Sequence, residues 1–396
     1  CQRSSVLAWT RTRGPALPTP CSPVIGWQDT RARTGVEALA PRATDIRRAS
    51  GLVLSAHYGA GKLHQLWRAQ AANAHLRLGP LAAFLVEALT GTAAVDHANA
   101  QRTQLLGLER LDWEPFLLEA FRLPGTMLPP VRPILHDYGR IRDTDMTLRA
   151  VSGDQNAAWF SHGPPTEGTA RVNLGSGGFV LAALPHGQAP PELLQTLALS
   201  APGETAWLLE ATLNGAGSAF EWLREHQGVE HAETRLDHAL ATVTQPPLFI
   251  NTVGGLGSPW WTTGLAPQFS EIRNPPEPLE QIAAVGESIL FLVVANLERM
   301  RRHVDIRRLH ISGGLAQSDT LCQRLADLSG LPTERLTDTE ASARGIAWLA
   351  AGRPTTWATH GGRRFDPRRD PSLEERYRRS LARLDALAGH GPTAKT

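Results

Sequence analysis

The spacing of apolar residues along the chain predicts several helices. Residues 280–300 give the clearest one, because apolar side chains recur there three and four positions apart. These side chains are Ile282, Val285, Ile289, Val293 and Leu297. Residues 79–90 and 115–122 also predict helices, with Asp112 as a candidate N-cap of the second.

Strands and glycine turns alternate with these helices. Residues 4–9 and 22–27 predict short strands, and residues 170–184 predict two strands around a glycine turn. Residues 307–314 predict a strand that ends in a glycine turn, followed by a helix over 319–330 that ends at Gly330. Residues 333–352 repeat the strand–helix pattern. Such alternation is typical of α/β layers. The tail, residues 361–396, predicts an exposed charged helix with a solvated face and a frayed end.

Composition narrows the class of protein. The 396 residues exceed what one core usually supports, so two domains are expected. A net charge of +2 is too small to indicate a nucleic-acid partner, and no apolar run reaches the ~20 residues of a membrane span. Three widely spaced cysteines, Cys1, Cys21 and Cys322, argue against a disulfide framework or a zinc site and favour a reducing cytoplasm. The histidines lack the spacing of metal ligands, so no protein-held metal is expected.

Two glycine-rich turns are candidate phosphate sites. In "NLGSGGF", residues 173–179, backbone N–H groups can converge on an anion without hindrance from Cβ atoms, although an ordinary hairpin turn has the same sequence features. In "ISGGLAQSD", residues 311–319, a second turn joins a strand to a helix, which is a common place for a nucleotide. Neither turn fits the Gly-x-Gly-x-x-Gly pattern of a dehydrogenase. "GAGKL" is not a P-loop, because Ala56 and Leu63 stand where that loop needs Gly and Ser or Thr.

Asp154 is the candidate catalytic carboxylate. It lies in "VSGDQNAAWF", residues 151–160, at the start of a predicted helix. It could cap that helix, which is the commoner role for such an Asp. It could also accept a proton from a substrate hydroxyl as a general base. Local sequence leaves both interpretations open.

Nine segments in one order resemble the FGGY family of carbohydrate kinases. The likeness runs from residue 2 to about residue 352. The segments are "CQRSSVLAW", "WQDTRAR", "NAQRTQLLGLERLDW", "GDQNAAWF", "NLGSGGF", "NGAGSAFEWLRE", "GGLGSPWW", "ISGGLAQSD" and "EASARGIAWLAAG". The resemblance implies an α/β fold of two actin-like or ribonuclease-H-like domains with an interdomain cleft: residues 1–164 as the remainder of the sugar-binding domain and residues 165–396 as the nucleotide-binding domain.

The resemblance also implies an activity and a set of site residues. It implies ATP-dependent phosphorylation of a sugar or polyol hydroxyl, with ATP and Mg²⁺ required and Asp154 as the base. The implied substrate-binding residues are Arg3, Trp27, His57, Asp154, Gln155 and Phe179. The implied nucleotide-binding residues are Gly175, Ser176, Gly177, Gly217, Glu221, Gly314 and Ser318. A small-molecule substrate is then the expected partner, with no nucleic acid or membrane, and a homo-oligomer stays open.

Departures from the family pattern bear on the substrate. Glycerol kinases have Glu where this chain has Ser4 and Tyr where it has His57, which disfavours glycerol and leaves other polyols or ketoses open. The family also begins with a strand and a glycine-rich phosphate hairpin upstream of Cys1, so the resemblance predicts an N-terminally incomplete chain whose first domain lacks strands. The competing hypothesis is therefore a degenerate, non-catalytic sugar- or nucleotide-binding protein.

Overall fold

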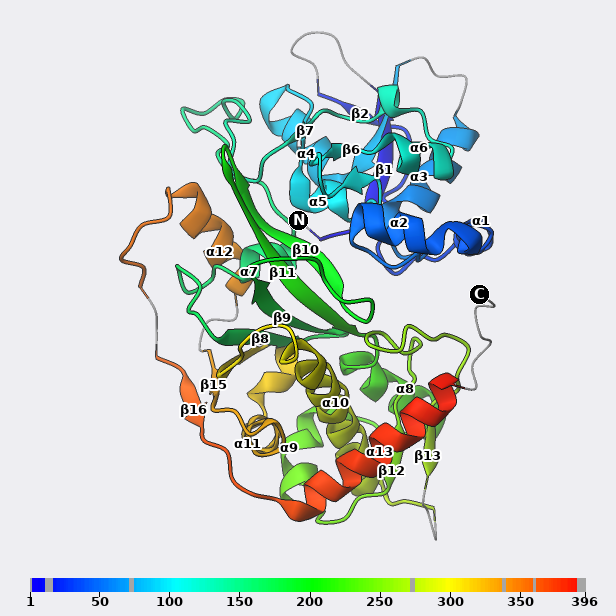
Figure 1. The fold of residues 1–396 in the computed structure, drawn as a ribbon, viewed down its shortest axis with the longest axis vertical. Helices are drawn as coiled ribbons and strands as arrows, with labels where there is room; N and C mark the ends of the chain where they lie inside the picture. The colour runs from blue at the N-terminus through cyan, green and yellow to red at the C-terminus, as the bar shows by residue number, and fades with distance from the viewer. Residues whose placement is uncertain are drawn as a thin grey trace. The chain divides into compact units, whose positions relative to one another are not determined.

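The computed structural model describes residues 2–10, 17–70, 75–270, 275–336, 340–358 and 361–389 (Figure 1). The chain forms two compact units, each of which is made of three separate segments of the sequence. Unit 1 comprises Cys1–Pro165, Leu194–Leu208 and Glu340–Ala358. Unit 2 comprises Thr166–Leu193, Leu209–Thr339 and Thr359–Thr396. The single domain boundary drawn at 164/165 from the sequence stays a prediction.

Unit 1 is built around a three-stranded antiparallel sheet in the order β2-β1-β3. The helices α1, α2, α3 and α6 share a hydrophobic core with it. The elements of this unit up to its first break are β1 (Val6–Thr10), β2 (Thr19–Pro20), α1 (Arg33–Glu37), η1 (Ala40–Arg42), α2 (Ala43–Ser50), α3 (Gly59–Ala69), β3 (Leu76–Pro80), α4 (Leu81–Thr90), β4 (Val95–Asp96), α5 (His97–Gln101), β5 (Leu106–Gly107), β6 (Asp112–Trp113), α6 (Pro115–Ala120), η2 (Gly125–Met127), β7 (Val131–Arg132) and α7 (Asp154–Ala158). Later segments add β10 (Leu194–Ala201) and α12 (Ala341–Ala350).

The central strand β1 is buried on both faces. Val6 and Ala8 belong to one core cluster, whereas Leu7 and Trp9 belong to another. Because successive side chains of a strand point to opposite faces, the run "VLAW" has apolar neighbours on both sides of the sheet. The first strand expected from the sequence is therefore confirmed.

Two local expectations for unit 1 are wrong. Residues 22–27 do not form a strand: β2 lies earlier, at Thr19–Pro20, and Ile25 makes only an isolated bridge to Val6. Asp112 lies in β6, and the N-cap of α6 is Glu114, whose side chain accepts from the N–H of Phe116. In both places, tertiary pairing of short segments overrode the local pattern.

Unit 2 contains most of a seven-stranded mixed sheet in the order β10-β11-β9-β8-β14-β15-β16. β8 and β9 form the expected antiparallel hairpin, and β8 pairs in parallel with β14. The remaining strands are β8 (Thr169–Leu174), β9 (Gly178–Leu184), β11 (Glu204–Leu213), β12 (Leu248–Ile250), β13 (Gln268–Ser270), β14 (Arg308–Ser312), β15 (Thr333–Arg335) and β16 (Arg363–Phe365). The helices are α8 (Gly217–Gln227), α9 (Ala232–Thr242), α10 (Pro278–Met300), η3 (Gly314–Gln317), α11 (Asp319–Ser329) and α13 (Pro371–Gly389).

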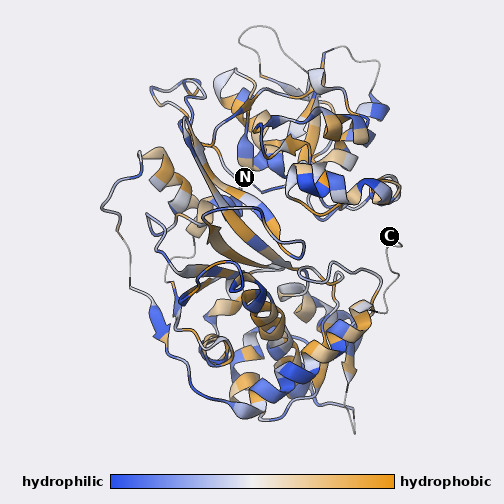
Figure 2. Cartoon of the chain, viewed as in Figure 1, coloured by the Kyte–Doolittle hydropathy of each residue, from blue (hydrophilic) through white to orange (hydrophobic). Residues whose placement is uncertain are grey.

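The long apolar helix α10 is the core of unit 2. Among the described residues it is the one helix long and apolar enough to cross a membrane by length and composition, and 83% of that window is buried inside the protein. It packs against α9 and α11, most of its residues are buried and apolar, and the part visible in Figure 2 is largely hydrophobic, as is typical of a core helix. Its N-terminus carries a capping box formed by Glu277 and Glu280.

The C-terminal helix α13 is not only a solvated face. Its outer side is hydrophilic in Figure 2, but five of its side chains are buried: Leu373, Arg376, Tyr377, Ser380 and Leu384. Arg376 forms a buried ion pair with Glu287 of α10. The expected exposed helix is therefore corrected to one that packs on unit 2, while the expected frayed end lies outside the described residues.

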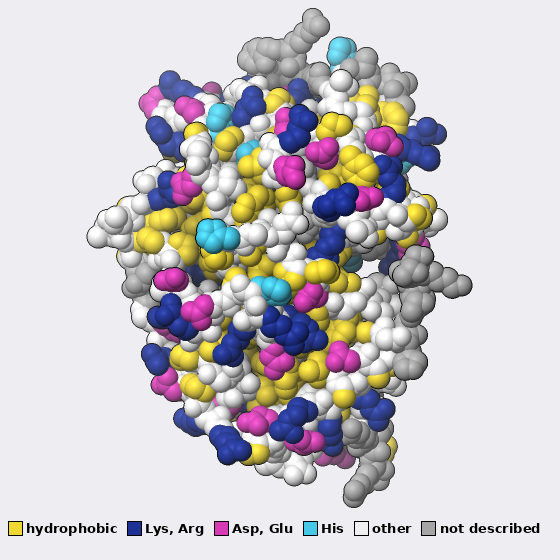
Figure 3. All heavy atoms as spheres, viewed as in Figure 1, with side chains coloured by type: hydrophobic (Ala, Val, Ile, Leu, Met, Phe, Trp, Pro, Cys, Tyr) yellow, Lys and Arg dark blue, Asp and Glu magenta, His cyan; other side chains and the backbone are white. Residues whose placement is uncertain are grey.

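The surface matches the balanced composition. On the face shown in Figure 3, cationic and anionic side chains are interspersed, with hydrophobic side chains among them. Mixed charges of this kind are typical of an ordinary solvated protein surface.

Candidate active site

Asp154 begins α7 but does not cap it. The N-cap residue is Gly153, and the Asp154 side chain makes no capping bond. Its Oδ1 accepts from the N–H of Gln155 at 2.8 Å, and the side chain is 34% exposed. The structure thus removes the capping interpretation and leaves a carboxylate that solvent or a substrate can reach.

Arg3 lies beside this carboxylate. Its Nε is 3.4 Å from Asp154 Oδ1, and its Nη1 donates to Asn156 Oδ1 at 3.3 Å. Arg3 is buried, and it passes so close to Gly153 that a Cβ there would lie 2.6 Å from the Arg3 side chain. The glycine before Asp154 is therefore needed for the contact between Arg3 and the start of α7.

Helix α12 fixes α7 from 188 positions along the chain. The Ser342 hydroxyl donates to the carbonyl of Asp154 at 2.9 Å, and the rings of Phe160 and Trp348 stack with centroids 5.4 Å apart. Gly345 lies so close to α7 that an added Cβ would be 1.7 Å from the Ala157 carbonyl oxygen. Sequence reasoning did not assign α12 to the site. Its small residues in "EASARG" were the available signal.

We expect Gly345→Ala to disturb the position of Asp154. A Cβ cannot occupy 1.7 Å from a carbonyl oxygen, so α12 and α7 must move apart. Since misplacing a reacting group by about 1 Å can cost about 10²-fold in rate, we expect kcat to fall by roughly 10–100-fold. Steady-state kinetics would measure this. Gly35→Ala, in α1 with open space around its Cβ, is the control and should leave kcat unchanged; an equal loss in both variants would contradict the argument.

Trp27, His57 and Gln155 lie in the same unit as Asp154. Gln155 follows Asp154 in α7 and is half-buried, as is Trp27. His57 is exposed, and its Nδ1 lies 3.3 Å from the Trp27 carbonyl oxygen. Because a carbonyl only accepts, Nδ1 carries the hydrogen and Nε2 is an acceptor. Desolvation lowers the pKa of His57, and the positive charges of Lys62 and Arg33 lower it further, so the ring is neutral near pH 7.

The expected nucleotide residues gather in unit 2. The β8–β9 turn, Gly175–Ser176–Gly177, contacts the start of α8: the N–H of Gly217 donates to Gly175 O at 2.8 Å and that of Ser218 to Ser176 O at 2.9 Å. The register of β14 on β8 pairs Ser312 with Asn173 and so carries the second glycine turn to the same sheet edge. Two turns 138 residues apart therefore form one glycine-rich edge.

The N–H groups of this edge are only partly used. Gly175 N–H donates to Gly177 O within the turn, whereas the bonds of the described residues include none from the N–H of Ser176 or Gly177. Both residues are accessible. Adjacent amides of this kind can bind an anion.

Ser318 has a structural role that the sequence did not predict. It caps α11, because its hydroxyl oxygen accepts from the N–H of Leu321 at 3.1 Å, and it donates to Asp237 Oδ1 at 2.7 Å. Burial opposes ionisation of Asp237, but bonds from the Thr320 N–H and the Ser318 hydroxyl lower the pKa of this carboxyl. Gly314 has open space around it, and Glu221 is exposed one turn after Gly217 on α8.

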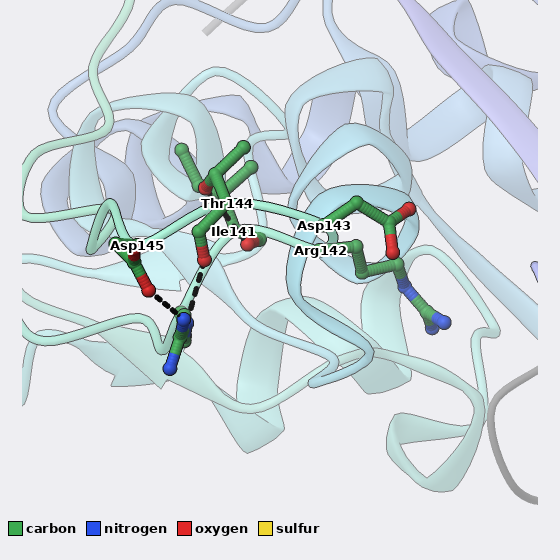
Figure 4. A pocket seen from close by; sticks show the side chains of 6 residues that line it. Ile141, Arg142, Asp143, Thr144 and Asp145 are labelled. Atoms are coloured by element: carbon green, nitrogen blue, oxygen red, sulfur yellow. Dashed lines mark hydrogen bonds and ion pairs between the residues drawn. The ribbon is translucent and has the colours of Figure 1, made fainter.

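Phe179 is the one expected substrate residue in unit 2, on β9, whereas the others lie in unit 1. No group of three His, Cys, Asp or Glu side chains that could hold a metal ion occurs in the described ranges. A hollow in the segment that connects β7 to α7 along the chain is lined by the consecutive residues 140–145, with Arg140 paired to Asp145 (Figure 4). It contains none of the expected site residues.

Comparisons with known proteins agree with these features. Models of the N-terminal and C-terminal domains of the FGGY family of carbohydrate kinases match residues 17–152 and 170–352. A glycerol kinase of Trichodesmium erythraeum (strain IMS101) is 30% identical over 373 residues, which span 88% of this chain and 73% of that protein. The chain belongs to the FGGY family. A glycerol kinase of Geobacter sp. (strain M21) is 29% identical over 408 residues, spanning 96% of this chain and 81% of that protein.

Solved structures share the FGGY fold. A Plasmodium falciparum glycerol kinase with ADP superposes with a TM-score of 0.84 at 19% identity, covering 98% of this chain and 82% of that one. A Rhodospirillum rubrum xylulose kinase gives 0.82 at 19% identity, with the same shares covered. The expected α/β fold of two actin-like domains is confirmed, and so is the expected class of activity. The protein is a carbohydrate kinase that phosphorylates a sugar or polyol hydroxyl with ATP, and the non-catalytic alternative is not favoured.

Proposed function

We propose that Asp154 is the general base of this FGGY kinase. The observation that carries the proposal is the carboxylate at the start of α7, partly exposed, free of a capping role and beside the buried Arg3. A general base must be within hydrogen-bond reach of the proton that it removes, which requires a carboxylate that a substrate can reach.

The reaction transfers the γ-phosphoryl group of ATP to an acceptor hydroxyl. The hydroxyl oxygen forms the new bond to the γ-phosphorus, the bond from that phosphorus to the β–γ bridging oxygen breaks, and ADP leaves with the electron pair. Asp154 takes the hydroxyl proton. Because the transition state is loose, positioning and charge stabilisation supply most of the acceleration. Arg3 would hold the acceptor and Asp154 in register.

The acceptor site is assigned to Arg3, Trp27, His57, Gln155 and Phe179. His57 supports an acceptor bound through its own hydroxyl hydrogens, since Nε2 is the lone-pair side of a neutral ring. Ser4, which replaces a family carboxylate, has φ 63° and donates its hydroxyl to Arg102 O at 3.4 Å. These two differences favour a polyol or ketose other than glycerol.

The glycine-rich edge of unit 2 is assigned to ATP. The amides of Ser176 and Gly177 suit phosphate oxygens, with Gly175 and Gly217 shaping the turn. Glu221, Gly314 and Ser318 are assigned to the nucleoside, with Ser318 acting as the cap that orders the start of α11.

Mg²⁺ would enter with ATP. Magnesium is commonly held by phosphates, waters and one or two carboxylates. It would neutralise phosphate charge during transfer. Residence in the cytoplasm and a homo-oligomeric state stay predictions.

The test is ADP release by the chain with ATP and Mg²⁺ over a panel of glycerol, other polyols, pentuloses and sedoheptulose. We expect a polyol or ketose other than glycerol to give the highest kcat/KM. Highest activity with glycerol would contradict the reading of Ser4 and His57. ADP release that does not depend on any acceptor would contradict the assigned acceptor site.

A further inference from the structure

Lys62 is a buried cation that neither the reaction nor the fold comparison explains. It is one of two lysines in the chain and lies in the first turns of α3 with 0% of its surface exposed. Its Nζ donates at 2.8 Å to both Gly26 O and His57 O, and it lies 3.3 Å from Trp27 O and 3.4 Å from Ser4 O. The described ion pairs include none with Lys62.

Four backbone carbonyls therefore replace the water shell of this ammonium. An ammonium has three N–H donors, so two are used in the short bonds and the third is shared between Trp27 and Ser4. Buried charges are costly unless they are hydrogen-bonded in this way. The carbonyls come from three separate stretches of chain, at Ser4, at Gly26–Trp27 and at His57, and Lys62 Nζ contacts all three.

Each of these stretches carries a residue of the proposed acceptor site. Ser4 follows Arg3, Trp27 contributes its own carbonyl, and His57 contributes another. The Trp27 carbonyl also accepts from His57 Nδ1 at 3.3 Å. Helix α3 is itself fixed, because the N–H groups of Gly59 and Ala60 donate to Arg102 O and Thr103 O.

We propose that Lys62 is a positioning residue of the acceptor site, whose ammonium ties the segments bearing Arg3, Trp27 and His57 to helix α3. This inference rests on the assignment of those three residues to the acceptor. Loss of the ammonium would remove a donor from all four carbonyls and leave the three segments held only by their remaining contacts, such as Trp27 O with His57 Nδ1 and the bridge between Val6 and Ile25. Acceptor binding would weaken, whereas ATP binding would not, since the glycine-rich edge belongs to unit 2.

Lys62→Met tests the proposal kinetically. Methionine keeps much of the side-chain length and supplies no donor. Since about 1 Å of misplacement can cost about 10²-fold, we expect the KM of the best acceptor of the panel to rise about 10–100-fold while the KM of ATP changes less than about twofold. Arg68→Met removes an exposed cation from the same helix and should change neither value. Equal increases in both KM values would overturn the proposal.

Chemical rescue separates positioning from a general loss of fold. Lys62→Ala removes three methylenes and the ammonium, which n-propylammonium supplies. We expect n-propylammonium, and not the uncharged 1-propanol, to restore a low acceptor KM. Rescue by both compounds to the same degree would show that Lys62 only fills space.

The pH dependence gives a further signature. Burial lowers the pKa of Lys62 from its ordinary 10.5 to about 8; the Asp29 charge opposes this shift and the Arg31 charge adds to it, while His57 nearby is already neutral. The folded protein thus loses this proton before the unfolded chain does, so this group's contribution to stability rises with pH between about 8 and 10.5. The neutral amine has only two donors, so acceptor KM should rise as the pH passes through about 8, the pKa of Lys62 in the folded protein. Lys62→Arg, which stays charged, should not show that rise, and an identical profile would count against the proposal.

Hydrogen exchange tests the same contacts without catalysis. In Lys62→Met we expect faster amide exchange in residues 2–5, 26–29 and 55–58, with α10 of unit 2 unchanged. This readout holds even if every acceptor in the panel is silent, so failure of the kinase assignment and failure of the Lys62 proposal are distinguishable. Unchanged exchange in all three segments would overturn the proposal.

Discussion

Asp154→Asn is expected to lower kcat by about 10²–10⁴-fold, the usual contribution of a positioned general base. Asparagine keeps the size of the side chain, and its Oδ1 can still accept from the N–H of Gln155. It cannot take up the acceptor proton at neutral pH, and it loses the charge that faces Arg3 Nε at 3.4 Å. Steady-state ADP release with the best acceptor would measure the effect, with the KM of ATP nearly unchanged.

The matched control for this substitution is Asp145→Asn. Asp145 lies in the same unit on an exposed loop, and its side chain is 95% exposed and paired to Arg140. An exposed ion pair contributes little, so Asp145→Asn should keep kcat within about twofold. If Asp154→Asn also stayed within twofold, Asp154 would not be the base and the proposed mechanism would fail.

The second large effect is expected on stability. Glu287 of α10 is 1% exposed and accepts from two guanidinium groups: Arg376 Nε at 2.7 Å and Nη2 at 2.6 Å, and Arg324 Nη1. Glu287→Gln would remove the carboxylate charge that the buried Arg376 and the half-buried Arg324 share. Breaking a buried ion pair from one side typically costs about 3–5 kcal/mol. At about 2–4 °C per kcal/mol, the Tm should fall by roughly 6–20 °C, which calorimetry or circular dichroism would measure.

Two variants control for this result. Arg378→Met removes exposed ion pairs that Arg378 forms with Glu374 and Glu375 within α13. It should change the free energy of unfolding by less than about 0.5 kcal/mol. The triple variant Glu287→Met/Arg324→Met/Arg376→Met removes all three charges together and should be less destabilised than Glu287→Gln, because no buried charge is left unpaired. A Tm for Glu287→Gln within about 1–2 °C of the parent corresponds to a change in unfolding free energy of about 0.5 kcal/mol. That result would show that water screens the charges of Glu287, Arg324 and Arg376.

The parts of the site that the sequence predicts are those whose conformation is set by a short motif. The β8–β9 hairpin and the start of α7 at Asp154 both follow from local residues, because glycine turns and helix starts depend on a few neighbouring positions. The meaning of Asp154 was not readable. The tertiary structure places Gly153 at the N-cap and Arg3 beside the carboxylate, which supports the proposed base, while the role of Asp154 stays a prediction.

Residues that act through distant backbone were missed. The segment around Lys62 is not a P-loop, and its sequence assigns Lys62 no role, because its four partners lie between 5 and 58 positions away. Asp237 reaches the Ser318 cap from α9, 81 positions earlier. No spacing rule links such residues, since hydrogen bonds to backbone carbonyls leave no side-chain pattern in the partner sequence.

The sequence by itself determined the helices whose apolar pattern and ends are set by their own residues. Helix α10 follows from its apolar run and capping box, and α11 from its apolar face and the left-handed Gly330 at its end. Tertiary structure decided three features that the local sequence does not specify uniquely: the short strand β2, the cap of α6 and the burial of the charged helix α13. Arg376 has the same local sequence character as its exposed neighbours, and only Glu287 on another helix makes its burial favourable.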